Sequence, residues 1–398
     1  MHFTKVMINP SANGWIKKFF LENKSNYKDY NNDLLAFYHD VRTSGFIYGH
    51  VIQINLIQEM ETKNLSSDEI TKIALLNSLF SIFKIITKSD DEKEFEEKAI
   101  SFYLFLHQKT TILFTKSKPN LEECIATRIQ TNENIFARNF SHILTNALLF
   151  MDILAFKKYL ETFDNPVNYL KKIEESTIVL VSNALSVKEN PSQYDALLVK
   201  LFENSLRYTK FYKKKLETTD FEQFEKFDSI IEKLYLLDLA TMAMWSDDEL
   251  TAIEKDYLQT LCVELQIKDS EYTISLQNID TYIKLYRNEI PYFKYSNPVK
   301  HFYEQSNKTV TKLITRNGKR LTKELKESKE LLKLLAKSTT TDLDKDEKKK
   351  VKKQLLDICK TIPSLTIFLL PGGGILLPIL IKYIPQLLPS AFNENLEE

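Results

Sequence analysis

Apolar residues recur at spacings of three and four through most of the first 215 residues, which is the pattern of one buried face on successive helices. The run Ser66–Glu69 has the spacing of a capping box and predicts a helix over Ile70–Thr87. Further helices are predicted over about Asp90–Phe114 and Asn132–Leu160, and Pro166 marks the start of another. We therefore expect residues 1–215 to form an N-terminal helical domain.

A second helical unit is predicted over residues 220–295. Its first apolar face comprises Ile230, Leu234, Leu237, Thr241 and Met244. A polar break follows Trp245, and the run Thr251–Glu254 then forms another capping box. The second apolar face comprises Ile253, Tyr257, Leu261 and Leu265. Together these patterns predict a helical hairpin with an acidic loop.

A third region is expected over residues 299–398. One long helix or a bent pair is predicted over residues 299–337, with an apolar face made of Leu321, Leu325, Ser328, Leu332 and Leu335. A polar linker, Ser338–Asp346, precedes a short basic helix over Asp346–Lys360. The chain then becomes apolar over residues 361–392.

The first part of this apolar tail, Thr361–Ile381, contains no charged residue, and its 21 positions match the length of a membrane-spanning helix. Proline removes a backbone donor, and glycine destabilises a helix by about 1 kcal/mol relative to alanine, so a continuous span is disfavoured. Two interpretations follow, a kinked or re-entrant membrane segment and a soluble helical hairpin. The residues that would shape either one are Pro363, Pro371, Gly372, Gly373, Gly374, Pro378, Pro385, Pro389 and Phe392.

The charges that flank the tail are asymmetric. Lysines precede it at Lys345, Lys348, Lys349, Lys350, Lys352 and Lys353, and glutamates follow it at Glu394, Glu397 and Glu398. This is the asymmetry of a membrane segment whose N-terminal side faces the cytoplasm. If the tail is instead a hairpin, we expect two short helical arms over residues 362–392 that meet at Pro371–Gly374. Their apolar faces would be buried together or against Leu325, Leu332 and Leu335.

Composition supports an all-α fold, because the chain has only seven glycines and three of them are consecutive. The 54 basic and 54 acidic residues cancel, so no global charge attracts DNA, and we expect no DNA partner. The three cysteines, Cys124, Cys262 and Cys359, are too dispersed for a disulfide framework and are expected to be buried in a protein from a reducing compartment. The first 20 residues do not have the pattern of a signal peptide.

The sequence offers little catalytic chemistry. It lacks a phosphate-binding glycine loop, a nucleophile elbow and a paired-histidine motif, and we expect no enzymatic activity. Asp342, Asp344 and Asp346 have the first spacings of an EF-hand loop, but Glu347 and Lys353 stand where glycine and the bidentate glutamate are needed. They are therefore interpreted as a charged linker and helix start.

Three runs near the C-terminus resemble a known family: Lys353–Pro363, Phe368–Pro378 and Tyr383–Phe392, the last closing with Pro-x-Leu-Leu-Pro-Ser-x-Phe. Over residues 320–392 the chain resembles the Letm family, the leucine-zipper, EF-hand-containing transmembrane proteins of mitochondria and their bacterial relatives. It is similar to bacterial Letm-related proteins described as biofilm-associated. The resemblance implies membrane association, a link to cation/proton exchange and a domain named for ribosome binding. The sequence stops six residues after Phe392, so the region that follows in the family is not expected here.

The acidic hairpin also resembles the TerB-type module of tellurite-resistance proteins. Asp247, Glu249 and Glu254 match the acidic positions of that module, with Asp248 in the place of its glycine. These carboxylates could hold a divalent cation through oxygen ligands, and otherwise they simply cap a helix. No other cofactor is expected.

From these features we expect a non-enzymatic, membrane-associated helical protein of Letm type with a structural or adaptor role, tied to ribosome binding, cation homeostasis or biofilm formation. The alternative is a soluble, TerB-like, metal-responsive stress protein. The expected location is the cytoplasmic side of a membrane, the bacterial inner membrane if the tail is inserted, and the cytoplasm otherwise.

Overall fold

The computed structural model describes residues 8–62, 65–107, 119–129, 146–187, 227–245, 250–286, 317–341 and 343–362, together with residues 199, 307, 310–311, 314–315, 365, 380–381 and 384. Within this part of the chain the backbone forms thirteen α-helices, one 3-10 helix and no strand. An isolated antiparallel bridge joins Tyr27 to Leu56. The predicted all-α fold is confirmed.

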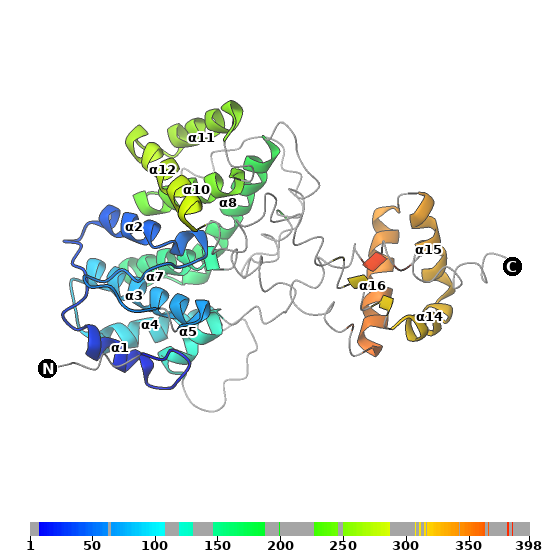
Figure 1. Cartoon of the computed structure of the whole chain (residues 1–398), viewed down its shortest axis with the longest axis horizontal. Helices are drawn as coiled ribbons and strands as arrows, with labels where there is room; N and C mark the ends of the chain where they lie inside the picture. Colours follow the sequence, from blue (N-terminus) through cyan, green and yellow to red (C-terminus); the bar gives the residue numbers. More distant parts are fainter. Residues whose placement is uncertain are drawn as a thin grey trace.

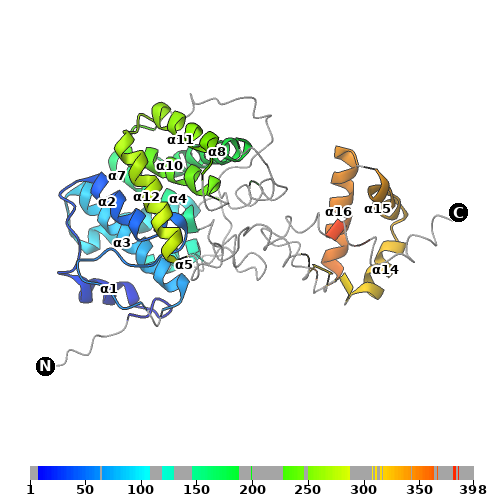
Figure 2. The same ribbon diagram turned by 45° about the horizontal axis from the view of Figure 1, so that its top comes forward.

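The larger body is built around one continuous hydrophobic core that extends from Ile8 to Ile283 (Figures 1 and 2). Its helices are α1 (Trp15–Asn23), α2 (Leu34–Thr43), η1 (Phe46–Tyr48), α3 (Ser67–Thr87), α4 (Glu92–His107), α5 (Leu121–Ile129), α7 (Phe150–Thr162), α8 (Pro166–Ser186), α10 (Ile230–Met244), α11 (Ala252–Glu264) and α12 (Asp269–Tyr286).

Helix α3 lies at the centre of the N-terminal half. It begins at the predicted capping box, in which Ser66 Oγ accepts from the Glu69 N–H and the Glu69 carboxylate accepts from the Ser66 N–H. It packs against α5 and α7, and nearly every residue from Thr71 to Phe83 is buried. Among the described residues it is the one helix long and apolar enough to cross a membrane, but 78% of its apolar window is buried inside the protein. Its apolar composition therefore fits a core helix.

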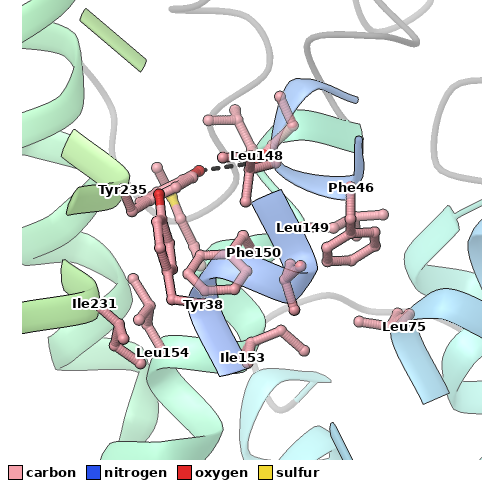
Figure 3. Packing of buried hydrophobic residues seen from close by; sticks show 14 of the residues in the cluster. Tyr38, Phe46, Leu75, Leu148, Leu149, Phe150, Ile153, Leu154, Ile231 and Tyr235 are labelled. Carbon is pink, nitrogen blue, oxygen red and sulfur yellow. Dashed lines mark hydrogen bonds between the residues drawn. The ribbon is translucent and has the colours of Figure 1, made fainter. Parts of the chain in front are cut away.

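Helix α10 has the same central role in the other half of the body. Of the predicted face, Leu234, Leu237, Thr241 and Met244 are buried, as are the residues between them, whereas Ile230 in the first turn is only partly buried. This helix packs against α2, α8, α11 and α12. In Figure 3 the rings of Tyr38, Phe150 and Tyr235 lie together, and the dashed line is the bond that Tyr235 Oη donates to the Ala147 carbonyl at 3.0 Å.

A buried ion pair connects α10 to α2 and α12. The Asp238 carboxylate accepts from Arg42 Nε at 2.8 Å, from Tyr38 Oη at 2.5 Å and from Ser275 Oγ. The Arg42 side chain has no exposed surface and that of Asp238 is 2% exposed. Burial alone would lower the pKa of Arg42, but the Asp238 carboxylate raises it above its ordinary value. Burial, and then the same carboxylate, raise the pKa of Tyr38 well above its ordinary value.

This ion pair and the shared core span the two regions that the sequence separates, 1–215 and 220–295. Tyr38 and Arg42 belong to the first region, and Asp238 and Ser275 belong to the second. The expected boundary between residues 215 and 220 lies outside the described residues, so the division remains a prediction.

In the larger body, two details of the helix predictions are wrong. The helix expected over Asn132–Leu160 is not continuous, because a turn at Leu148 and Leu149 precedes α7. Ile253, expected on the buried face of α11, is 44% exposed. It lies in the first turn of that helix, where the buried side chain is Glu254, and burial resumes at Tyr257 and Leu258.

The C-terminal unit has a hydrophobic core of its own and stands apart from the larger body in both views (Figures 1 and 2). It comprises α14 (Gly318–Lys326), α15 (Lys329–Thr340) and α16 (Lys345–Thr361). The alternative of a bent helix pair is therefore the correct one for the described part of residues 299–337, since the break falls at Glu327 and Ser328. The predicted basic helix corresponds to α16, but the linker expected over Ser338–Asp346 is shorter than predicted, because α15 continues to Thr340 and α16 begins at Lys345.

Candidate functional site

The C-terminal unit buries one face of each of its helices. The predicted face of α14 and α15 contributes Leu321, Leu325, Leu332 and Leu335, and α16 contributes Val351, Leu355, Ile358 and Cys359. Four buried residues of the apolar tail complete the same core: Ile362, which is 1% exposed, and Leu365, Leu380 and Ile384, which have no exposed surface. The predicted contact between tail residues and the Leu325–Leu335 face therefore has a counterpart in the described part of the tail.

Polar contacts align α15 and α16 side by side. At one end, Glu330 accepts from Lys350 Nζ at 3.1 Å and from Gln354 Nε2 at 2.9 Å, and Ser328 Oγ donates to Gln354 Oε1 at 3.1 Å. At the other end, Lys337 Nζ donates to Glu347 Oε1 at 2.6 Å. The two helices therefore run antiparallel, since Glu330 near the start of α15 pairs with Lys350 and Gln354, whereas Lys337 further along α15 pairs with the earlier residue Glu347 of α16.

These contacts also shift the pKa values of the carboxyl groups. The hydrogen bonds from Lys350 and then Gln354 lower the pKa of Glu330 below its ordinary value. The hydrogen bond from Lys337 lowers the pKa of Glu347, and the same bond raises the pKa of Lys337. The lowered pKa values favour the charged form of both carboxylates.

Helix α16 begins at Asp344, whose carboxylate accepts from the backbone N–H groups of Asp346 and Glu347 at 2.9 and 2.8 Å. Glu347 completes a capping box by accepting from the Asp344 N–H at 3.0 Å. These acids therefore act as a helix start, as the interpretation against an EF-hand loop predicts.

The outer face of α16 is strongly basic. All the predicted flank residues are exposed, namely Lys348, Lys349, Lys350, Lys352 and Lys353, and so are Lys345 and Lys360. Between residues 317 and 362 the sequence has 14 Lys or Arg and eight Asp or Glu, an excess of six positive charges in a chain that is neutral as a whole. The C-terminal unit is therefore the basic part of this protein.

The remaining predicted tail residues, from Pro363 and Pro371–Gly374 through Pro378, Pro385, Pro389 and Phe392, lie outside the described residues. Whether Gly372–Gly374 forms a turn stays a prediction.

Of the predicted metal ligands, Asp247 and Glu249 lie outside the described residues, whereas Glu254 is described and 6% exposed. Glu254 Oε2 accepts from the Thr251 N–H at 2.8 Å, and Thr251 Oγ1 accepts from the Glu254 N–H at 3.3 Å. This residue thus caps α11. Within the described part of the chain no group of three metal-ligating side chains is assembled.

A polar pocket of about 450 Å³ opens between the loop that precedes α2 and the C-terminal end of α3. Its charged lining residues include Asp29, Asp90, Lys84 and Lys88, together with Lys28, whose charge is matched by both oxygens of Asp40. Opposite charges therefore balance in this pocket, and it favours no ligand of one sign.

The buried ion pairs are the polar features that the sequence patterns do not reveal. Besides Arg42 and Asp238, Arg128 Nε of α5 donates to Asp152 Oδ2 of α7 at 2.7 Å. A charged residue on an otherwise apolar helix face is the signal that marks such positions, as at Asp152 within α7 and Asp238 within α10. All three cysteines are buried, which confirms that prediction, and burial raises the pKa of each to about 12.

Comparison with known protein families finds a match that begins within this basic unit. Residues 343–398 match the family model described as "LETM1-like, RBD". Searches among curated proteins and among solved structures each gave no match. The matched residues begin at Leu343, directly before α16, and include both that helix and the apolar tail. The resemblance found in the motifs of the tail is thereby confirmed over residues 343–398, which form a LETM1-like domain.

Proposed function

We propose that this protein is a non-enzymatic, membrane-associated helical adaptor of Letm type. The observation that carries this proposal is the LETM1-like domain at residues 343–398, in which the basic helix α16 directly precedes the uncharged segment Thr361–Ile381. A basic flank beside an apolar segment is the arrangement by which proteins orient on the cytoplasmic side of a membrane. The larger helical body would then be the part that the membrane-associated domain presents to partners.

Fractionation of cells that produce the native chain tests this proposal. We expect the protein in the membrane fraction, and its recovery after a salt wash, an alkaline wash or detergent defines how it is attached. Complete recovery as a monodisperse soluble protein without detergent would contradict the proposal.

Ribosome binding is the second candidate function. It is supported by the description of the matching model, "LETM1-like, RBD", together with the implied domain named for ribosome binding and the excess of positive charge in the C-terminal unit. Co-sedimentation of the purified protein with ribosomes at two salt concentrations would test it, and a protein that stays in the supernatant at both would exclude it. Roles in cation homeostasis or biofilm formation are further proposals that rest on the family resemblance alone.

A soluble, TerB-like, metal-responsive protein is the alternative. Helices α10 and α11 pack against each other, which supports this alternative, but Glu254 already serves as a helix cap. Calorimetry with calcium, manganese and zinc, on the native chain and on Asp247→Ala, discriminates between the two roles. The absence of heat at millimolar metal would remove this alternative.

A further inference from the structure

One face of α16 carries exposed lysines that point away from the core of the C-terminal unit. With 3.6 residues per turn, Lys349, Lys353 and Lys360 lie opposite the face formed by Val351, Leu355 and Ile358, and Lys345 and Lys352 lie beside them. We call these five lysines the outer lysine face. All five are exposed, whereas the opposite face is buried in the core.

Of the outer lysine face, only Lys360 forms an ion pair in the described part of the chain. In the described part of the chain, the ion pairs of α16 involve Lys350 with Glu330, Lys337 with Glu347 and Lys360 with Asp357. The other four lysines of the outer lysine face form no ion pair there. Exposed, unpaired lysines on one side of a helix provide a surface for a negatively charged partner.

Part of the apolar tail is buried in the core of the folded protein. Leu365, Leu380 and Ile384 have no exposed surface and share a core with Leu325, Leu332 and Leu335. Inserting these three residues into a bilayer would require that core to open. The outer lysine face is available to a membrane without any such rearrangement.

The chemistry of this surface favours lipid headgroups over nucleic acid. Residues 317–362 contain no Phe, Tyr or Trp, so helices α14, α15 and α16 offer no ring on which a base could stack. Clusters of four to eight lysines beside an apolar segment are typical of proteins that bind anionic lipids.

We propose that the outer lysine face of α16 binds the headgroups of anionic phospholipids, and that this electrostatic contact attaches the folded C-terminal unit to the membrane surface. This deepens the proposed membrane association and rests on it. The attachment is peripheral, so it depends on salt and on lipid charge.

The test uses the full chain and two kinds of vesicle, phosphatidylcholine alone and phosphatidylcholine with about 30% phosphatidylserine. Co-sedimentation is measured at about 0.1 M and about 1 M salt, between which the screening length falls from about 10 to about 3 Å. The variant Lys349→Glu/Lys353→Glu reverses two charges of the outer lysine face. The matched control, Lys255→Glu/Lys268→Glu, reverses two exposed lysines of the larger body. Circular dichroism verifies that both variants are folded.

We expect binding only to the vesicles that contain phosphatidylserine, and release at high salt. The Lys349→Glu/Lys353→Glu variant should bind at least about tenfold more weakly, because each lysine near an anionic surface contributes about one factor of five in affinity. The control variant should bind like the native chain.

Three results would overturn this assignment. Binding that resists salt, ignores lipid charge and is unchanged in Lys349→Glu/Lys353→Glu would mean that the tail inserts, and the proposed membrane association would survive. If the protein bound neither kind of vesicle, both the role of the outer lysine face and the proposed membrane association would be wrong. The third result is that the native chain binds polyuridylate and not the vesicles, and that the Lys349→Glu/Lys353→Glu variant loses this binding. It would identify the surface as one for RNA.

Discussion

At the scale of single residues, the stability of the larger body depends on a few buried polar side chains. Asp238 is the common acceptor for Tyr38 and Arg42 of α2 and for Ser275 of α12. A buried ion pair contributes little when both partners are exchanged for apolar residues, but the loss of one partner leaves an uncompensated charge in the core. Arg42, with no exposed surface, has no route to water.

We therefore predict that Asp238→Ala lowers the free energy of unfolding by about 3–5 kcal/mol, the range for breaking a buried pair. Denaturant unfolding followed by circular dichroism measures this change. Asp280→Ala, which removes a surface partner of Lys284, is the control and should cost less than about 1 kcal/mol. If the two variants were equally stable, the Asp238 cluster would have no structural role. The double variant Arg42→Met/Asp238→Leu should regain part of the loss.

Two glycines allow backbone strain to be separated from crowding. Gly14 and Gly45 have φ values of 85° and 79°, a conformation that disfavours any side chain by about 1–2 kcal/mol. A Cβ at Gly14 would meet nothing within 4 Å, whereas one at Gly45 would contact the His50 carbonyl and approach Tyr282 Cε2 to 2.6 Å. Gly45→Ala should therefore destabilise the protein more than Gly14→Ala in the same unfolding assay. Equal effects would show that Tyr282 and His50 move aside without cost.

At the scale of elements, the register of α15 against α16 depends on ionised carboxylates. The pKa values of Glu330 and Glu347 lie below 4.5 in the folded state. A lowered pKa contributes stability that is present above the unfolded value of about 4.5 and is lost as the pH falls through the folded value. Both groups are on the surface, so the effect is local.

We predict that hydrogen exchange in α15 and α16 accelerates as the pH falls below 4.5, after correction for the intrinsic rate. Mass spectrometry of peptides from these two helices is the measurement. In the variant Glu330→Gln/Glu347→Gln the corrected rates should already be high at neutral pH and should change little on acidification. An unchanged pH profile in this variant would show that other groups control the pairing.

Local signals in the sequence predict the helices better than they predict what the helices bury. The capping boxes at Ser66 and Thr251 begin α3 and α11 as expected, because their bonds join residues three positions apart. The pair of Arg42 and Asp238 joins residues 196 positions apart, and no periodicity contains that information. Ile253 shows the same limit, since its spacing fits an apolar stripe although no neighbouring helix covers it.

The candidate surface was partly accessible from sequence for the same reason. The lysines before the apolar tail and the Letm motifs are contiguous in the chain, so they could be recognised directly. The sequence could not show which lysines form ion pairs, because Glu330 reaches Lys350 and Glu347 reaches Lys337 only when α15 and α16 are packed together.

At the scale of the whole molecule, two separate cores imply two units that respond independently to change. One core extends over α1–α12, and the other contains α14–α16 and described residues of the apolar tail. Leu365, Leu380 and Ile384 belong to the second core, so the tail is a structural element of that unit as well as a candidate membrane segment.

Deletion of Pro363–Phe392 is therefore expected to destabilise α14–α16, to release the protein from membranes, or both, while the larger body keeps its melting temperature. Each apolar side chain of the size of Leu380 or Ile384 contributes roughly 2–5 kcal/mol when it is fully buried. Thermal unfolding and fractionation of the truncated chain measure the two effects. Unchanged melting of the C-terminal unit together with unchanged location would show that the tail is dispensable.

Helix α3 exposes apolar surface during synthesis until its neighbouring helices are made. This helix is long and apolar enough to cross a membrane, and it is buried because neighbours such as α5 and α7 pack against it. Those neighbours leave the ribosome later, so α3 transiently exposes hydrophobic surface to chaperones and to the membrane-insertion machinery. Expression of fragments that end before Phe150 should for this reason yield aggregated or mistargeted chains, and any fragment meant for solution work must extend through α7.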